Sequence, residues 1–317
     1  MVFHRDTPHL RPAIASVLGQ TFRDLELVLV DNGTGLPPQT LGPLGDDRRI
    51  RWVRLPRNEG IPTGHNAGVA AAAGGFCALL DYDDLALPGR IEAQVTALRA
   101  DPNLALVSSF AEKMDEMGRP IGRVFCLPDA EDHLPYSLYA APVITPAAMG
   151  RREVFLSHPY RPAFPFAADL DFQSRLAEHA CMGVLREVHV KYRVYRTQTT
   201  QDKSSAIVRS RCIISLLAAR RRNGRREGLD DLITLGGSMS AAAFCAHLCG
   251  LASAEGFAEL AAYFARRMLA LQRSPITAIK SLRLFATARK QAAPADRKNI
   301  TRMYLSGPVR ALGVGPA

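Results

Sequence analysis

The sequence lacks the long apolar segments that mark membrane-spanning proteins and the leader that marks secreted ones. No stretch reaches the roughly 18 apolar residues that a spanning helix needs, and the longest candidate, residues 241–254, is shorter and contains His247. The first eight residues, Met-Val-Phe-His-Arg-Asp-Thr-Pro, have no apolar core of the kind that signal peptides carry. We therefore expect a cytoplasmic protein.

Cysteine usage excludes a disulfide framework. The six cysteines include no Cys-x-x-Cys pair and no disulfide-like spacing, which fits a reducing compartment. Cys77 and Cys181 stand among apolar residues and are expected to be buried thiols. Cys245 and Cys249 lie four residues apart on an expected helix with His247 between them. They could bind a metal, but no second ligand pair accompanies them, so the structural reading is favoured.

The remaining composition is ordinary for a soluble globular protein, except for the position of its charge. The 317 residues are 47% hydrophobic and 22% charged, enough for one large domain or two smaller ones. From Lys203 onward there are 19 basic and 6 acidic residues, a net charge of +13. Since the whole chain carries +10, the first 202 residues carry −3. The basic excess therefore belongs to the C-terminal third.

Hydrophobic periodicity divides the chain into an α/β part and a helical part. Helical spacing covers residues 8–20, 63–73, 88–100 and 168–179, and strand-like runs cover residues 25–30, 50–55, 76–80, 104–108 and 188–195. Strands that alternate with helices favour a parallel sheet. The pattern loosens over residues 110–165, and beyond Ser205 we expect four or five helices and no strand. The predicted domains are residues 1–203 and 204–317.

One apolar run ends in a dense group of carboxylates. Residues 76–80 read as a buried strand, and Asp81, Asp83 and Asp84 follow within four residues. Strands of open parallel sheets present their carboxyl ends to a ligand crevice. Like charges so close repel one another unless a cation lies between them. Carboxylates alone suit a hard divalent ion, so Mg²⁺ or Mn²⁺ is the predicted cofactor.

Five other segments accompany the carboxylate group in a particular order. With that group, they are Ala15–Phe22 (Ser-Val-Leu-Gly-Gln-Thr), Val30–Thr34 (Val-Asp-Asn-Gly-Thr), Asn58–Gly68 (Asn-Glu-Gly with His-Asn-Ala-Gly), Leu80–Asp84, Ala168–Leu176 (Ala-Asp-Leu-Asp-Phe with Arg-Leu) and Tyr192–Arg193. Together they resemble, in order, the segments of the family 2 glycosyltransferases. That resemblance implies the GT-A fold, a mixed sheet flanked by helices, followed here by an all-helical region.

The resemblance also implies roles for individual residues. Asp83, shared with Asp81, would hold the divalent ion, and Asp169 would be the general base. The nucleotide-sugar contacts would be Asp31, Asn58, Gly60, Asn66, Asp81 and Arg193. The reaction would move a sugar with inversion from a nucleotide-diphosphate donor, expected to be a UDP-sugar, to a carbohydrate or lipid-linked acceptor. Cell-envelope polysaccharide synthesis is the implied setting.

Each of these residues also has a plainer reading. Asp31 could cap a turn, and Asn58 and Gly60 could shape a loop. Asp169 could be a carboxylate at a helix N-terminus, Asp84 is favoured as a helix cap, and Asp171 is expected to be structural. The chain departs from the family at Ala168, His65 and Tyr195, and only residues 1–4 stand for the first strand, which is therefore expected to be truncated.

Two other functions compete with the transferase. A non-catalytic nucleotide-sugar binder would need the same loops without turnover. A haloacid-dehalogenase-like phosphatase also carries Asp-x-Asp after a strand, but its pattern wants Thr or Val where Leu85 stands and usually lies near the N-terminus.

The basic cluster Arg220–Arg222 with Arg225 and Arg226 has two readings. It could form solvated helix ends, or it could contact an anionic leaflet and place the protein peripherally at the inner face of the membrane. Nucleic acid is not expected, because no nucleic-acid motif accompanies the charge. Undiminished liposome binding by a chain ending near Ser205 would contradict the membrane reading.

Overall fold

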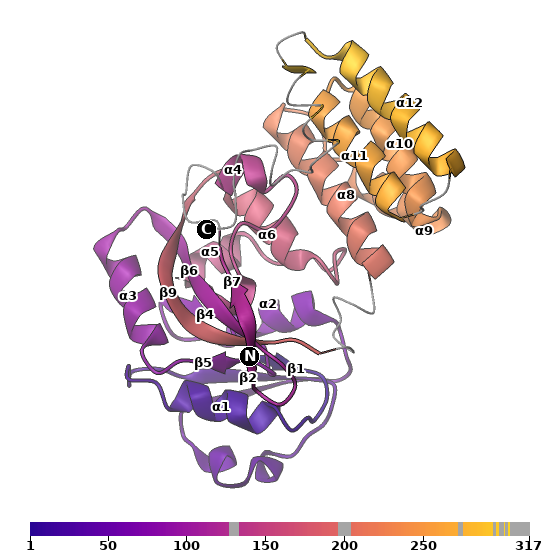
Figure 1. Cartoon of the computed structure of the whole chain (residues 1–317). Helices are drawn as coiled ribbons and strands as arrows, with labels where there is room; N and C mark the ends of the chain where they lie inside the picture. The colour runs from indigo at the N-terminus through magenta and orange to yellow at the C-terminus, as the bar shows by residue number, and fades with distance from the viewer. Residues whose placement is uncertain are drawn as a thin grey trace. The chain divides into compact units, whose positions relative to one another are not determined.

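The computed structural model describes residues 1–126, 133–195, 204–271, 275–293, 296–297, 301 and 304. The chain divides into two compact units (Figure 1). Unit 1 comprises Met1–His133 and Ala141–Gln198, and unit 2 comprises Leu134–Ala140 and Thr199–Ala317. The border predicted after residue 203 directly follows residues 196–203, which lie outside the described part, so it stays a prediction. The inclusion of Leu134–Ala140 in unit 2 was not anticipated.

Unit 1 is built on two sheets. A parallel sheet has the order β1 (Val2–Phe3), β2 (Leu27–Asn32) and β3 (Ile50–Leu55). The second sheet has the order β4-β8-β6-β9-β5, with β7 paired to β6. Its strands are β4 (Phe76–Ala78), β5 (Leu85–Ala86), β6 (Leu104–Met114), β7 (Pro120–Val124), β8 (Met149–Arg151) and β9 (Cys181–Arg193). Because β6 runs parallel to β9 but antiparallel to β7 and β8, this sheet is mixed.

Helices flank these sheets through apolar faces. Helix α1 (Leu10–Leu18) buries Leu10, Ala13, Ile14 and Leu18, the three-to-four-residue spacing of one helix face. The other helical segments of unit 1 are η1 (Pro38–Asp46), α2 (Ile61–Ala71), α3 (Arg90–Ala100), η3 (Thr145–Ala147), α5 (Arg152–Ser157) and α6 (Ala168–Leu176). Figure 1 shows α3 beside the mixed sheet and α1 on the side of β1 and β2.

The structure corrects the sequence predictions in the middle of the chain. The strand predicted over residues 50–55 is confirmed as β3. Residues 110–165, which lacked a clear pattern, contain β7, β8, α5 and the end of β6. Strand β9 begins at Cys181, well before the predicted start, because it pairs along the whole of β6. Cys181 is exposed at that start, so its predicted burial was wrong, whereas Cys77 is buried.

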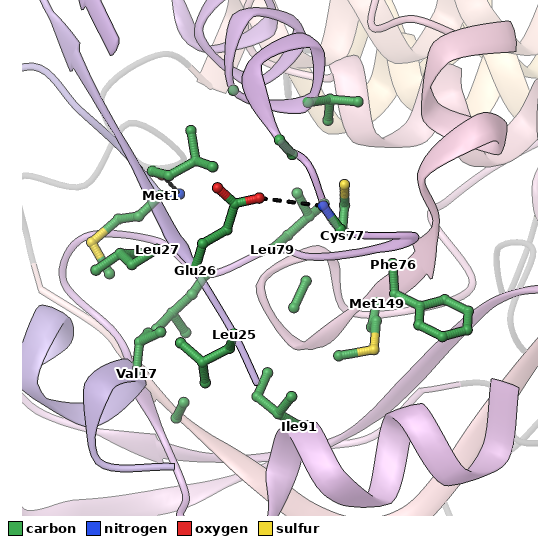
Figure 2. Close-up of a pocket in the computed structure, with 18 of the residues that line it drawn as sticks. Met1, Val17, Leu25, Glu26, Leu27, Phe76, Cys77, Leu79, Ile91 and Met149 are labelled. Atoms are coloured by element: carbon green, nitrogen blue, oxygen red, sulfur yellow. Dashed lines mark hydrogen bonds between the residues drawn. The ribbon is translucent and has the colours of Figure 1, made fainter. Parts of the chain in front are cut away.

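A pocket of ≈ 710 Å³ lies between β2 and β4. Strand β1 pairs with β2 only at Val30 and Asp31, and among the described residues β4 pairs only with β8. Figure 2 shows Glu26 and Leu27 on one side of the pocket and Phe76 and Cys77 on the other. Glu26 accepts a hydrogen bond from the backbone N–H of Ala73 across this space (2.5 Å). The gap separates the hydrogen-bonded ladders of the two sheets.

His65 of α2 lines this pocket, and its titration should make the stability of the protein depend on pH. Burial, assisted by the nearby Met1 ammonium group, lowers the pKa of His65 to about 3. Between pH 6.5 and about 3 the unfolded chain therefore binds a proton that the folded chain does not. The free energy of unfolding should fall as the pH falls through this window, by at most about 1.4 kcal/mol per pH unit.

We expect His65→Gln to flatten this pH dependence, measured by urea unfolding between pH 4 and pH 7. His179→Gln, which replaces an exposed histidine of the same unit, is the matched control and should keep the wild-type slope. A slope that His65→Gln leaves unchanged would show that the imidazole takes up its proton in the folded protein.

Besides most of the short α4 (His133–Tyr136), unit 2 contains five helices and no strand among its described residues. They are α8 (Ser204–Arg222), α9 (Leu229–Ser238), α10 (Ala241–Ala254), α11 (Ala258–Leu271) and α12 (Pro275–Gln291), which agrees with the predicted four or five (Figure 1). Over the described part of the chain, no helix combines the length and apolarity needed to cross a bilayer.

The cysteines of α10, which could have formed a metal site, contact other groups of unit 2. Cys245 Sγ lies 3.6 Å from Cys212 Sγ, and Cys249 Sγ donates to the carbonyl of Ala261. In the residues that the structure describes, the one cluster with metal-ligand spacing is made of carboxylates, so the cysteine metal site has no support.

Several arginines of the basic cluster form ion pairs or hydrogen bonds within unit 2. Arg220 pairs with Glu255 (2.6 Å), Arg221 pairs with Glu227, and Arg222 donates to Ser137. Arg225 is exposed but lies 3.7 Å from Glu255, and Arg226 is exposed. Membrane contact stays a prediction that rests mainly on these two residues.

Candidate active site

The carboxylate group of Asp81, Asp83 and Asp84 occupies the turn that follows β4. Leu79 and Leu80 are buried just before it, and the backbone N–H of Asp84 donates to the carbonyl of Asp81 (3.2 Å), which closes the turn. The three residues place one carboxylate oxygen each within 4.8 Å of one another. The predicted convergence of these side chains is therefore present.

Burial and the repulsion of neighbouring carboxylates disfavour the ionised forms of Asp81 and Asp84. Burial, then the charges of Asp83 and Asp169, raises the pKa of Asp81 to about 7. Burial, then Asp81 and Asp83, also raises the pKa of Asp84 well above its usual range. A divalent cation would relieve this repulsion and displace a proton as it bound.

Asp84 is held from a distant strand. One carboxylate oxygen accepts the backbone N–H of Arg193 (2.7 Å), and the other is buried with no hydrogen-bond partner. Helix α3 begins at Arg90 with Gly89 before it, so the predicted helix cap was wrong. An orphaned, buried carboxylate oxygen beside two further carboxylates fits a cation site.

Arg193 braces the backbone of the same turn. Its guanidinium donates to the carbonyl oxygens of Asp83 (2.8 Å), Glu116 (2.8 Å) and Asp115 (3.2 Å), and the residue is 5% exposed. These contacts make it a positioning residue for the carboxylates. Its predicted direct contact with a nucleotide sugar stays a prediction.

Asp83 already has a neutral hydrogen-bond partner. Tyr195 donates its hydroxyl to Asp83 Oδ2 (2.7 Å), and Arg5 donates to the hydroxyls of Tyr195 (3.4 Å) and Tyr82 (2.9 Å). Burial and the Asp83 charge raise the pKa of Tyr195, so it stays protonated. Sequence reasoning missed Arg5, although its position two residues after β1, at a strand's carboxyl end, was an available signal.

Asp169 stands in the first turn of α6, where exposed backbone N–H groups favour a carboxylate. It is half-buried and close enough to contribute to the raised pKa of Asp81. Asp171, two residues on, is fully buried and pairs with Arg161 and Arg175. This difference agrees with the structural role expected for Asp171 and leaves Asp169 as the carboxylate of α6 beside the cluster.

Hydrogen bonds connect the loop after β2 with the loop after β3. Asp31 accepts hydrogen bonds from the backbone N–H and the hydroxyl of Thr34, both at 2.7 Å, as a turn cap does. Asn32 bonds Asn58 (3.1 Å) and the carbonyl of Gly60 (3.2 Å). Gly60 has a positive φ of 85° at the start of α2. The structural readings of Asp31 and Asn58 are therefore present, and their nucleotide contacts stay predictions.

The side-chain amide of Asn66 forms hydrogen bonds with the protein backbone. It donates to the carbonyl of Tyr160 (2.8 Å) and accepts the backbone N–H of the same residue (2.9 Å). The sequence analysis missed Tyr160, which stands in the proline-rich segment Pro159–Pro162 without a local pattern to single it out. Asn66 therefore holds the backbone of Tyr160, and its predicted nucleotide-sugar contact stays a prediction.

Fold and site together define a class of protein. An α/β unit that gathers carboxylates at the end of a strand, beside two interlocked loops, has the arrangement in which α/β sheets bind ligands at the carboxyl ends of their strands. Residues 1–157, just under half of the chain, match Glycosyl transferase family 2. The recognition made from the six segments is thereby confirmed.

Several known proteins are similar to this chain. An uncharacterized glycosyltransferase of Haemophilus influenzae is 26% identical over 204 residues, covering 61% of this chain and 63% of the relative. One from Methanocaldococcus jannaschii is 25% identical over 199 residues, covering 61% and 68%. The succinoglycan biosynthesis protein ExoO of Rhizobium meliloti is 37% identical over 89 residues, covering 28% and 25%.

A solved structure shares the fold. Staphylococcus aureus TarS superposes with a TM-score of 0.52 at 14% identity, covering 97% of this chain and 55% of TarS. This likeness supports the GT-A fold. The chain thus spans less than two thirds of the Haemophilus relative and about half of TarS.

Proposed function

We propose that this protein transfers a sugar from a nucleotide-diphosphate donor, a UDP-sugar in the first instance, to an acceptor hydroxyl with inversion. The observation that carries the proposal is the meeting of Asp81, Asp83 and Asp84 with Asp169 in one neighbourhood. Cation-binding carboxylates beside a separate carboxylate base are the two parts that such a displacement needs.

Three carboxylates are assigned to binding the divalent ion. Asp83 and Asp81 would hold Mg²⁺ or Mn²⁺, and the orphaned oxygen of Asp84 is a further acceptor beside them. When bound, the ion would neutralise charge on the departing nucleoside diphosphate. Arg193 keeps the turn in shape, and Arg5 adds a positive charge at the mouth of the site, where the diphosphate would lie.

Asp169 would remove the proton from the acceptor hydroxyl as that oxygen attacks the anomeric carbon. Its place at the N-terminus of α6 stabilises the ionised form that a base requires. Asp31, Asn58 and Gly60 would border the nucleoside. A carbohydrate or lipid-linked molecule is the proposed acceptor.

The test is turnover of a UDP-sugar panel by the full chain, with Mn²⁺ and with EDTA. We expect UDP release that EDTA stops and Mn²⁺ restores. Binding of the panel without release would favour the non-catalytic binder. Release of phosphate from p-nitrophenyl phosphate would favour the phosphatase instead, and either outcome would overturn the proposal.

A further inference from the structure

The hydroxyl of Tyr160 is a buried polar group without a partner. Tyr160 is 3% exposed, and its Oη has no hydrogen-bond partner. A buried hydroxyl in this state destabilises the folded protein, so such groups call for an explanation. Only five side-chain atoms of the described residues share this state, and two of them belong to Tyr160 and Asp84 of the candidate site.

The ring of Tyr160 is held so that its hydroxyl cannot turn away to find a partner. Asn66 bonds both the N–H and the carbonyl of its backbone. Its ring packs against Phe172 (4.9 Å between centroids), His65 (5.3 Å) and Phe155 (6.4 Å). The orientation of the phenol is therefore set before any ligand arrives.

The ring contact with Phe172 sets Tyr160 against α6, the helix that carries Asp169. Phe172, which packs on the Tyr160 ring, follows Asp169 by three residues on α6, and residues at that spacing share a helix face. Burial, then the charges of Asp169 and Asp81, raises the pKa of Tyr160, so the phenol stays protonated.

We propose that the Tyr160 hydroxyl forms a hydrogen bond with a hydroxyl of the transferred sugar, and so helps to select the donor. The inference rests on the proposed function, in which Asp81 holds the ion and Asp169 removes the acceptor proton, so that the transferred sugar would lie near both. A neutral phenol matches a neutral sugar hydroxyl, whereas the diphosphate has Arg5 at the mouth of the site. Asn66 then serves as a positioning residue for this contact.

The experiment compares Tyr160→Phe with the wild type, using the UDP-sugar of the panel that the wild type turns over fastest. We expect the KM for that donor to rise about tenfold, which corresponds to about 1.4 kcal/mol. The inhibition constant of UDP, which lacks the sugar, should not change. The thermal unfolding midpoint should stay equal or rise, because the variant removes a hydroxyl that has no partner in the protein.

A matched control is Tyr139→Phe, which removes the hydroxyl of a buried tyrosine in edge-to-face contact with Tyr263 in unit 2. It should leave the KM and the UDP inhibition constant unchanged. Tyr160→Phe with an unchanged KM would overturn the inference, as would parallel losses of UDP affinity and stability, which a structural hydroxyl would produce. A wild-type protein that turns over no nucleotide sugar would instead overturn the proposed function and the inference with it.

Discussion

Asp83→Asn should reduce Mn²⁺-dependent UDP release by a factor on the order of 10²–10³. Loss of a carboxylate ligand removes much of the several kcal/mol that a bound ion contributes to a charged transition state. The amide keeps the shape of the side chain and can still accept the hydroxyl of Tyr195. The measurement is the rate of UDP release against Mn²⁺ concentration, with metal affinity measured separately by calorimetry.

Stability separates this effect from misfolding. Asp83→Asn removes a charge that raises the pKa values of Asp81 and Asp84, so its unfolding midpoint should equal or exceed that of the wild type. Asp101→Asn, which changes a carboxylate at the end of α3, is the control and should keep full metal-dependent activity. If Asp83→Asn kept the wild-type Mn²⁺ response, the ion would have to bind elsewhere.

The carboxylate cluster could be predicted because its signal is local. Asp81, Asp83 and Asp84 lie within four residues, so the end of one strand is enough to bring them together. The same holds for β3, whose six residues stand between two turns. Features that depend only on adjacent residues can be predicted without knowledge of the tertiary structure.

The supports of the cluster could not be predicted, because their partners are remote in sequence. Asp84 lies four residues before Pro88, which suggested a cap, yet its partner Arg193 lies 109 residues away. Asn66 and Tyr160 are 94 residues apart. Strands β6 and β9 likewise define each other's length only when paired. Sequence patterns identified the charged groups, and packing decided which side chains position them.

Asp169→Asn should lower UDP release by about 10²–10⁴-fold while leaving donor binding intact. The amide cannot accept the proton of the attacking hydroxyl, and a positioned base contributes about this factor. Asp169 is assigned to the acceptor side, so the affinity for UDP, measured by calorimetry with Mn²⁺ present, should not change. The expected signature is therefore a fall in kcat with a constant donor affinity.

Asp171→Asn supplies the contrast, because it lies two residues away on the same helix and differs in its contacts. Asp171 is fully buried between Arg161 and Arg175, and removing one partner of a buried ion pair typically costs about 3–5 kcal/mol. We expect Asp171→Asn to lower the unfolding midpoint, whereas Asp169→Asn should leave it in place. If Asp169→Asn instead lost stability and kept its turnover, Asp169 would be a helix-terminal carboxylate, and the base would have to be sought among the other carboxylates of the site.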